Sequence, residues 1–542
     1  MKKTIKYAAL IAMTVVMGSC NDWLTEDTPG SNKIEDYFVS TATATEVVNA
    51  TYAPLSFEYG TSTTFYSEWY IGDIVSDDAL KGGQGTTDMG AAYDMENFKT
   101  NPDNRLLLGF YNAQWQGIQR CNLAIQQVSM MEVGADAQFT QELKDRLVAE
   151  ATFMRSYYYF RLVRVFGGMP LIDYVVDSSN KFNFDRATLL ETYEFIIKGL
   201  ENAVEALPLK SKYAAADMGR ATRGAAQAML LKANLYYAGF LAQEGRDATA
   251  AYQAAKRWGE ELMTSGEYDL VPTYFDNFTL AGENGKESIF EIQYVEDPRS
   301  DYGEGEGFSR GTFTLIMQRP RSGFNDSETG WGFNHPTQNL YDEYEEGDLR
   351  RDATIMQQEG GEIDEASIYL GNYYYNRKYA QTTDGAGGTW YHLTHHSRGP
   401  LNYRLIRYSD ALLMYAEACC ELGDLTPAIT ALNRVRDRVG LSAFPYTATI
   451  QGQRVAFTSS QADLRRAIRH ERRVELAMEG HRWFDLCRWG IAKETMDAYI
   501  AGENDEVKAE YGIFQKGKHE LMPIPSEERQ LANGKLAQNP GY

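Results

Sequence analysis

Residues 409–439 read SDALLMYAEACCELGDLTPAITALNRVRDRV, and they predict two helices that pack against each other. The first helix is expected over 409–421 and the second over 426–439, with Leu422-Gly423-Asp424 as a short break between them. Small residues such as Ala416 and Ala428 allow two helices to approach closely, and a short loop makes them antiparallel neighbours. The stretch therefore predicts an antiparallel helical hairpin.

A similar arrangement occurs earlier in the chain. We expect helices over 223–239 and 248–265, separated by Glu244-Gly245-Arg246-Asp247. In both copies small and large residues alternate across a glycine-containing turn, which resembles the tetratricopeptide helix pair. Two readings remain open: divergent helical repeats interrupted by insertions, or two ordinary helical hairpins.

Helical periodicity continues on both sides of these hairpins. Further helices are expected over 45–59, 105–131, 141–166, 192–207, 462–477 and 482–489. Between about 265 and 404 the periodicity fades, and glycine, asparagine and aromatic residues dominate, with short strand-like pieces such as 288–294. Loops this long inside a compact domain are usually functional. The sequence thus predicts a mostly α fold with a loop-rich insertion.

The first twenty residues predict a secretory signal. Lys2, Lys3 and Lys6 precede a short apolar run, which is too short to span a bilayer. Met17-Gly18-Ser19-Cys20 resembles a lipobox, in which cleavage leaves Cys20 to be acylated. We expect residues 1–19 to be a lipoprotein signal peptide and 20–40 a lipid-anchored tether. The alternative is an ordinary signal peptide beside a chance cysteine.

Charge and composition exclude several classes of function. The 542 residues carry a formal net charge of −22, which disfavours a nucleic-acid partner. His392, His395 and His396 would suit a metal only on a helix, and the flanking glycines argue against one, so no metal or cofactor is expected. Calcium is the one ion left open, at a loop carrying Asp301, Glu304 and Glu306.

The aromatic residues of the non-helical regions predict a carbohydrate-binding surface. Sugar rings stack their apolar faces on flat aromatic rings, and their hydroxyls bond to neighbouring polar groups. The alternative is that these aromatics fasten the loops to the scaffold. The candidate ligand-binding residues are Trp69, Asp77, Tyr302, Phe308, Arg319, Trp331, Trp390 and Tyr391.

Five ordered blocks give the chain a family resemblance. They read EATFMRSYY at 150–158 with FGGMPL at 166–171, GRATRGA at 219–225, RYSDALLMYAEA at 407–418, ERRVELAMEGHRWFDL at 471–486, and HELMPIP at 519–525 with QNPGY at 538–542. Together with the lipobox, these blocks resemble the SusD/RagB family of nutrient-binding lipoproteins of Bacteroidetes.

The resemblance implies a tetratricopeptide-like helical scaffold with long loops and a few short strands over one face. It also implies an outer-membrane lipoprotein that faces the cell exterior and captures oligosaccharide without catalysis. The expected partner is a SusC/RagA-type TonB-dependent barrel transporter. We expect an N-terminal helical region over 41–265 and a C-terminal region over 266–542, divided into a loop-rich 266–404 and a helical 405–542, in one compact body.

Two alternatives to glycan capture stay open. One is a peptide-capturing member of the same family, because tetratricopeptide-like scaffolds often bind peptides. The other is a lipid-anchored glycoside hydrolase, which would need two carboxyl groups ~5–9 Å apart across the sugar. Asp77 and Asp78 are adjacent in sequence, and such neighbours rarely face the same bond.

Charged residues recur at three- and four-residue spacing in the fourth block. Glu471, Arg472, Glu475, Glu479 and Arg482 are expected to form a ladder of ion pairs along a helix. We interpret this ladder as a support of the helical core, with no role in contacting ligand.

Overall fold

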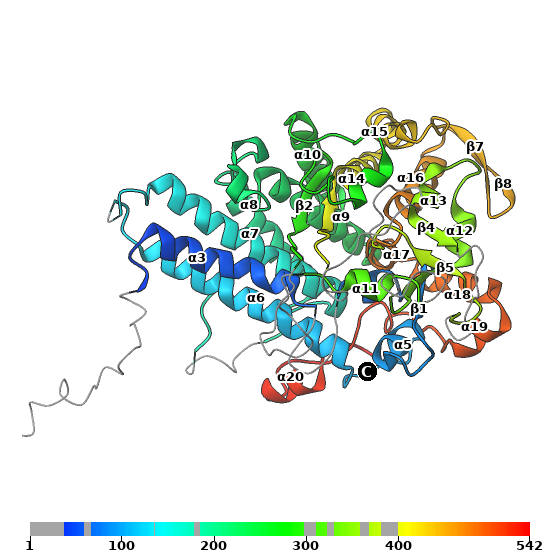
Figure 1. The fold of residues 1–542 in the computed structure, drawn as a ribbon, viewed down its shortest axis with the longest axis horizontal. Helices are drawn as coiled ribbons and strands as arrows, with labels where there is room; N and C mark the ends of the chain where they lie inside the picture. Colours follow the sequence, from blue (N-terminus) through cyan, green and yellow to red (C-terminus); the bar gives the residue numbers. More distant parts are fainter. Residues whose placement is uncertain are drawn as a thin grey trace, which may run out of the picture.

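The computed structural model describes residues 37–58, 67–134, 136–177, 185–296, 311–321, 330–357, 368–380 and 399–542. The protein is mostly helical, with a few short two-stranded ribbons, so the predicted fold class is confirmed. Figure 1 shows long helices at one end of the molecule and the short strands and helices of the C-terminal half at the other.

The helices of the N-terminal half include the longest ones in the described residues, α6 (Arg105–Met130) and α7 (Gln141–Phe166). In chain order the helices of this half are α3 (Thr41–Tyr52), α4 (Trp69–Gly72), α5 (Gly90–Glu96), α6, α7, α8 (Leu189–Val204), α9 (Arg223–Gln243) and α10 (Thr249–Thr264), with 3₁₀ turns η2 (Ala53–Ser56), η3 (Lys210–Lys212) and η4 (Ala215–Asp217). Helix α7 has the bounds expected from sequence. The Thr140 side chain accepts from Leu143 N at its start, and Gly167, at φ +78°, ends it.

The C-terminal half has shorter helices. They are η5 (Tyr274–Phe278), α11 (Thr314–Gln318), α12 (Gln338–Glu343), α13 (Leu349–Thr354), α14 (Tyr408–Glu421), α15 (Leu425–Arg438), α16 (Gln461–Leu476), α17 (Arg482–Arg488), α18 (Ala492–Gly502), α19 (Asp505–Glu510) and α20 (Ser526–Leu531). Helices α14 and α15 form the expected hairpin, and their bounds differ from the expected ones by about one residue.

The strands form four antiparallel pairs in the described residues. The pairs are β1 (Ala79–Gly82) with β3 (Phe333–Pro336), β2 (Ser288–Ile292) with β6 (Tyr403–Arg407), β4 (Ile355–Gln357) with β5 (Tyr374–Asn376), and β7 (Tyr446–Ile450) with β8 (Gln453–Phe457). The first pair joins segments about 250 residues apart, so it fastens the insertion to the N-terminal half.

The two helical hairpins pack directly against each other. Helix α10 of the first hairpin contacts α14 of the second. The helices approach closely at Gly259, where an added Cβ would lie 2.8 Å from a ring carbon of Tyr415. The two hairpins therefore stack side by side, as divergent helical repeats would.

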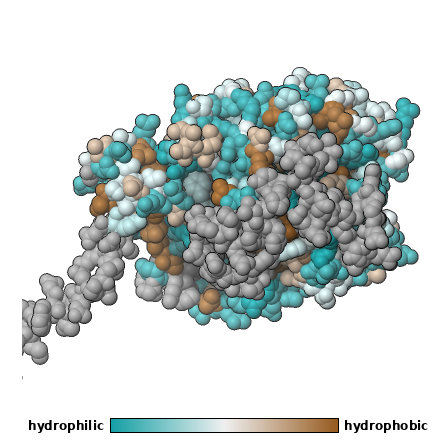
Figure 2. All heavy atoms as spheres, viewed as in Figure 1, coloured by the Kyte–Doolittle hydropathy of each residue, from teal (hydrophilic) through white to brown (hydrophobic). Residues whose placement is uncertain are grey.

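No helix in the described part of the chain is long and apolar enough to cross a membrane. The face seen in Figure 2 is largely hydrophilic, with hydrophobic residues scattered singly or in small groups where the surface is described. Such scattered residues are normal on protein surfaces. The core lies between the helices, and its largest apolar cluster reaches from Leu55 to Leu536.

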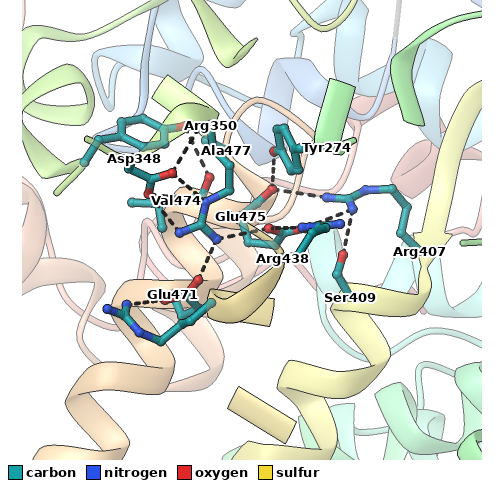
Figure 3. A network of polar contacts seen from close by, with 12 residues as sticks. Tyr274, Asp348, Arg350, Arg407, Ser409, Arg438, Glu471, Val474, Glu475 and Ala477 are labelled. Atoms are coloured by element: carbon teal, nitrogen blue, oxygen red, sulfur yellow. Dashed lines mark hydrogen bonds and ion pairs between the residues drawn. The ribbon is translucent and has the colours of Figure 1, made fainter. Parts of the chain in front are cut away.

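Beside this apolar core, a fully buried carboxylate holds the C-terminal half together. Glu475 of α16 accepts from Arg438 Nη2 at 2.6 Å, Arg407 Nη1 at 3.0 Å and Arg350 Nη1 at 3.1 Å (Figure 3). Burial alone would raise the pKa of Glu475, but the three guanidinium groups outweigh it and hold the pKa well below its usual range. The carboxylate thus joins α13, β6 and α15 to α16.

Two carboxylates close to Glu475 in sequence, one on α16 and one just after it, are paired in the same way. Glu471 contacts Arg350 at 2.5 Å and Arg436 at 2.8 Å, and Glu479 contacts Arg407 at 2.8 Å. The prediction that these charges pair with one another along one helix is therefore wrong. These side chains reach across to other elements, because a buried charge needs several partners in three dimensions.

His470 on the same helix carries a stabilised positive charge. Its Nδ1 lies 2.8 Å from Glu343 Oε1, and its Nε2 lies 3.3 Å from Glu345 Oε1. Burial would lower the pKa of His470, but the two carboxylates outweigh it and raise the pKa to about 9. Helix α16 is thereby tied to α12 and to the segment that follows it.

We predict that Glu475→Ala destabilises the protein by about 3–5 kcal/mol, because it leaves three buried arginines short of a partner. Urea unfolding measures the loss. Glu527→Ala is the control, since it removes one partner of the exposed pair with Arg105 and should change little. Unchanged stability of Glu475→Ala together with lost ligand binding would overturn the scaffold role.

A second prediction concerns pH. Because the folded-state pKa of His470 lies near 9 and its ordinary value is 6.5, the stabilisation is complete below about pH 6.5 and is lost as pH rises through 9. His470→Gln, which is uncharged at every pH, should therefore cost more unfolding free energy at pH 6 than at pH 10. A cost that is equal at both pH values would contradict the charged histidine.

Candidate functional site

Trp69 does not offer a ring to a ligand. The side chain is fully buried at the start of α4, where it packs on Tyr70 with ring centroids 3.9 Å apart. Its expected place on an exposed platform is wrong, because the apolar residues that follow it (Ile71, Ile74 and Val75) carry the whole segment into the core.

Asp77 is also an interior residue. Its carboxylate accepts from Arg482 Nε and Nη2, both at 2.8 Å, and lies 2.9 Å from Arg473 Nη2. Burial would raise the pKa of Asp77, but the two arginines outweigh it and lower the pKa to about 2. With both partners on the α16–α17 segment, Asp77 fastens the N-terminal half to the C-terminal half.

Arg319 is buried as well, against the expectation of a polar group beside a ligand. Its Nε donates to Ala380 O at 3.0 Å, and the residue has no exposed surface. The arginine therefore joins the end of helix α11 to the backbone at Ala380. Five further predicted residues lie outside the described ones, and they are Cys20, Tyr302, Phe308, Trp390 and Tyr391.

Trp331 is the predicted ligand residue that reaches the surface in the described part of the chain. It is half-buried, it stands two residues before strand β3, and it packs partly against the core. Its backbone N–H donates to Ile316 O at 2.7 Å, and its carbonyl accepts from Arg321 Nη1 at 2.9 Å. Both bonds fix the backbone that carries the ring.

The glycines on either side of Trp331 make this backbone position possible. A Cβ at Gly330 would lie 2.5 Å from Ile316 O, and one at Gly332 would lie 2.7 Å from the Arg321 side chain. Gly332 also has φ +66°, which favours glycine. The two glycines therefore let the backbone on either side of Trp331 lie close to Ile316 and to the side chain of Arg321.

A polar loop lies beside Trp331. Gly83 N donates to Gly332 O at 2.6 Å, which brings the segment Gly82–Asp88 next to the tryptophan. Arg321 Nη1 lies 3.8 Å from Asp88 Oδ2, and the same oxygen accepts from Gln84 N at 2.8 Å. We call Trp331, Arg321 and the Gly82–Asp88 loop the Trp331 platform.

The buried side chain of Lys81 fixes the shape of this loop. Its buried ammonium donates to the carbonyls of Gly82 at 2.6 Å, Gly85 at 2.9 Å and Asp88 at 2.6 Å. Burial lowers the pKa of Lys81 to about 8, although nearby carboxylates oppose this shift. Three backbone carbonyls bound by one cation give the loop a defined conformation before any ligand arrives.

The platform has the chemistry that sugar recognition needs. It combines a half-buried indole with an arginine, a carboxylate and the exposed side chains of Gln84, Thr86 and Thr87. Groups of three or more histidine, cysteine, aspartate or glutamate side chains able to hold a metal are absent from the described residues. Sequence reasoning missed the Gly82–Asp88 loop, for which the run Gly82-Gly83-Gln84-Gly85 was the available signal.

Two families match this chain. Residues 286–542 match the family described as "SusD family", and residues 22–235 match the one described as "Starch-binding associating with outer membrane". The SusD-like protein P2 of Formosa agariphila is 25% identical over 556 residues, which cover 100% of both chains.

Solved structures share the fold over nearly the whole chain. The surface glycan-binding protein A from Bacteroides fluxus superposes with a TM-score of 0.76 at 26% identity, over 93% of this chain and 99% of that one. A structure described as a laminarin binding SusD-like protein superposes with a TM-score of 0.73 at 27% identity, over 93% of this chain and 100% of that one. With the two family matches, these similarities confirm the resemblance found in the sequence, and the chain belongs to the SusD/RagB family.

Proposed function

We propose that the protein is a surface lipoprotein that captures a glycan and delivers it to a SusC/RagA-type TonB-dependent transporter, without catalysis. The observation that carries the proposal is the Trp331 platform, a half-buried ring fixed beside exposed polar side chains on a SusD-type scaffold. Cys20 is the proposed site of acylation, which would hold the protein at the outer membrane.

The relatives support a neutral glycan as the ligand. One solved relative is described as laminarin binding, and another was solved with laminarihexaose. The net charge of −22 also disfavours an anionic polysaccharide. Laminarin and starch are therefore the first probes, and a peptide pool tests the alternative of a peptide-capturing member.

One sequence feature makes hydrolysis a second candidate. Residues 307–311 read GFSRG, which matches the G-x-S-x-G pattern of serine hydrolases. The pattern alone is weak support, since it must stand between a strand and a helix, and residues 307–310 lie outside the described ones. Turnover of a nitrophenyl ester would favour a serine hydrolase, and release of reducing sugar from the same polysaccharides would favour the glycoside hydrolase.

We predict that Trp331→Ala weakens polysaccharide binding by roughly tenfold, the equivalent of about 1.4 kcal/mol of lost stacking. Trp331→Tyr should keep most of the affinity, because a flat ring remains. Affinity gel electrophoresis in laminarin or starch, followed by calorimetry, measures the change. Trp115→Ala removes a half-buried indole from helix α6 and serves as the control. Wild-type affinity in Trp331→Ala would refute the platform.

A further inference from the structure

A groove lies at the opposite end of the β1–β3 ribbon from Trp331. Its walls come from the residues after β3, from the start of β5 and from the segment that begins α19. The groove is open to solvent, and its cavity volume is about 210 Å³. Sites that enclose a whole small-molecule ligand typically occupy about 300–1,000 Å³, so this groove fits part of a polymer, such as a single sugar unit.

The wall that carries Tyr373 is rigid. Leu370 and Gly371 have φ of +51° and +76°, and Asn372 N donates to Tyr369 O at 3.0 Å, which makes a tight turn. The Asn372 side chain donates to Pro336 O at 2.7 Å and accepts from Tyr374 N at 2.7 Å. The turn is thereby bound to the end of strand β3.

The floor of the groove is equally well supported. Leu80, Tyr369 and Val507 form a small buried cluster beneath it. Lys81 Nζ lies 4.7 Å from the centre of the Tyr369 ring on the other side of that cluster. The groove therefore exists before any ligand binds, which lowers the entropy lost on binding.

Two tyrosines in this wall have different roles. Tyr374 stacks on Tyr341 at 4.8 Å with 12° between the ring planes, and its hydroxyl donates to Gln338 Oε1 at 2.9 Å. Tyr373 is 41% exposed, and neither its ring nor its hydroxyl has a partner among the described residues. Contacts with neighbouring side chains therefore hold Tyr374 in place, whereas the exposed ring of Tyr373 can contact a ligand.

Polar groups with no partner in the described part of the chain line the groove together with Tyr373. Asn504 accepts from Val507 N through Oδ1 at 3.0 Å, which leaves its Nδ2 without a partner in the described residues. Gln357 lines the groove with an exposed amide. A phenol ring, two amides and nearby backbone groups can bind a molecule that has both hydroxyl groups and an apolar face.

The charges around the groove narrow the class of ligand. Apart from two tyrosines, Glu503 is the one ionisable side chain among the described residues that line the groove. None of these lining residues is a lysine, an arginine or a histidine. The next residues, Asp505 and Glu506, are exposed acids. A phosphate, sulfate or uronate would be repelled, so the lining fits a neutral saccharide.

We propose that this groove is a second saccharide-binding site, with Tyr373 as its stacking ring and the amides of Asn504 and Gln357 as its polar contacts. This inference rests on the proposed function. The six residue-to-residue steps from Trp331 to Thr337 span roughly 20 Å at ~3.3 Å per step, so a polysaccharide lying along the ribbon reaches both sites. One chain held at two points binds more tightly than at either point alone.

The test uses variants on each side of the groove. Tyr373→Ala and Asn504→Ser should each weaken retention in a polysaccharide gel by roughly three- to tenfold, while serine still caps α19. Tyr373→Phe should keep most of the affinity, because stacking needs the ring more than the hydroxyl. Combined with Trp331→Ala, the Tyr373→Ala loss should multiply, since distant sites act independently.

Tyr174→Ala is the matched control, because Tyr174 is 42% exposed and lies outside the groove. Melting temperatures of all variants should match that of the wild type. If the wild type binds the polysaccharide and Tyr373→Ala and Asn504→Ser retain its full affinity, the second site is wrong and the proposed function stands. If the wild type binds no glycan and binds peptides instead, both proposals fail.

Discussion

The buried carboxylate of Glu475 is the constraint on which the arrangement of the C-terminal half depends. Its three arginine partners come from helix α13 inside the loop-rich insertion, strand β6 at the end of the insertion, and helix α15 after it. Taking four charged groups out of water is costly, and only a complete set of contacts offsets that cost. The network therefore favours one relative placement of these elements, and α16 stands at its centre.

The same helix controls the surface where we place ligand binding. Arg473 of α16 and Arg482 of α17 bind Asp77, two residues before strand β1. Strand β1 pairs with β3, and that ribbon carries the Trp331 platform at one end and the Tyr373 groove at the other. Buried ion pairs thus position a two-stranded ribbon, and the ribbon presents flat rings to solvent.

Sequence reasoning predicted the helices well and the ligand residues less well. Apolar periodicity, N-caps and glycine stops are local signals, so the bounds of α7 were predictable from Thr140 to Gly167. The partners of Glu475 were not predictable, since ion pairs between distant elements leave no local pattern.

Trp69 and Trp331 both stand in aromatic, loop-like sequence, yet Trp69 is fully buried in the core and Trp331 is only half-buried. Composition does not distinguish a ring that anchors a loop from one that faces solvent. The run Asn372-Tyr373-Tyr374-Tyr375-Asn376 was the overlooked signal for the groove.

The central claim is that a rigid, ion-paired interior carries the fold and that ligand contacts lie on the ribbon surface. Hydrogen–deuterium exchange with and without laminarin tests it most directly. The account predicts slower exchange with laminarin in residues 82–88 and 330–333, and unchanged exchange within α16. Slower exchange confined to α16 and its arginine partners, with the ribbon unaffected, would contradict it.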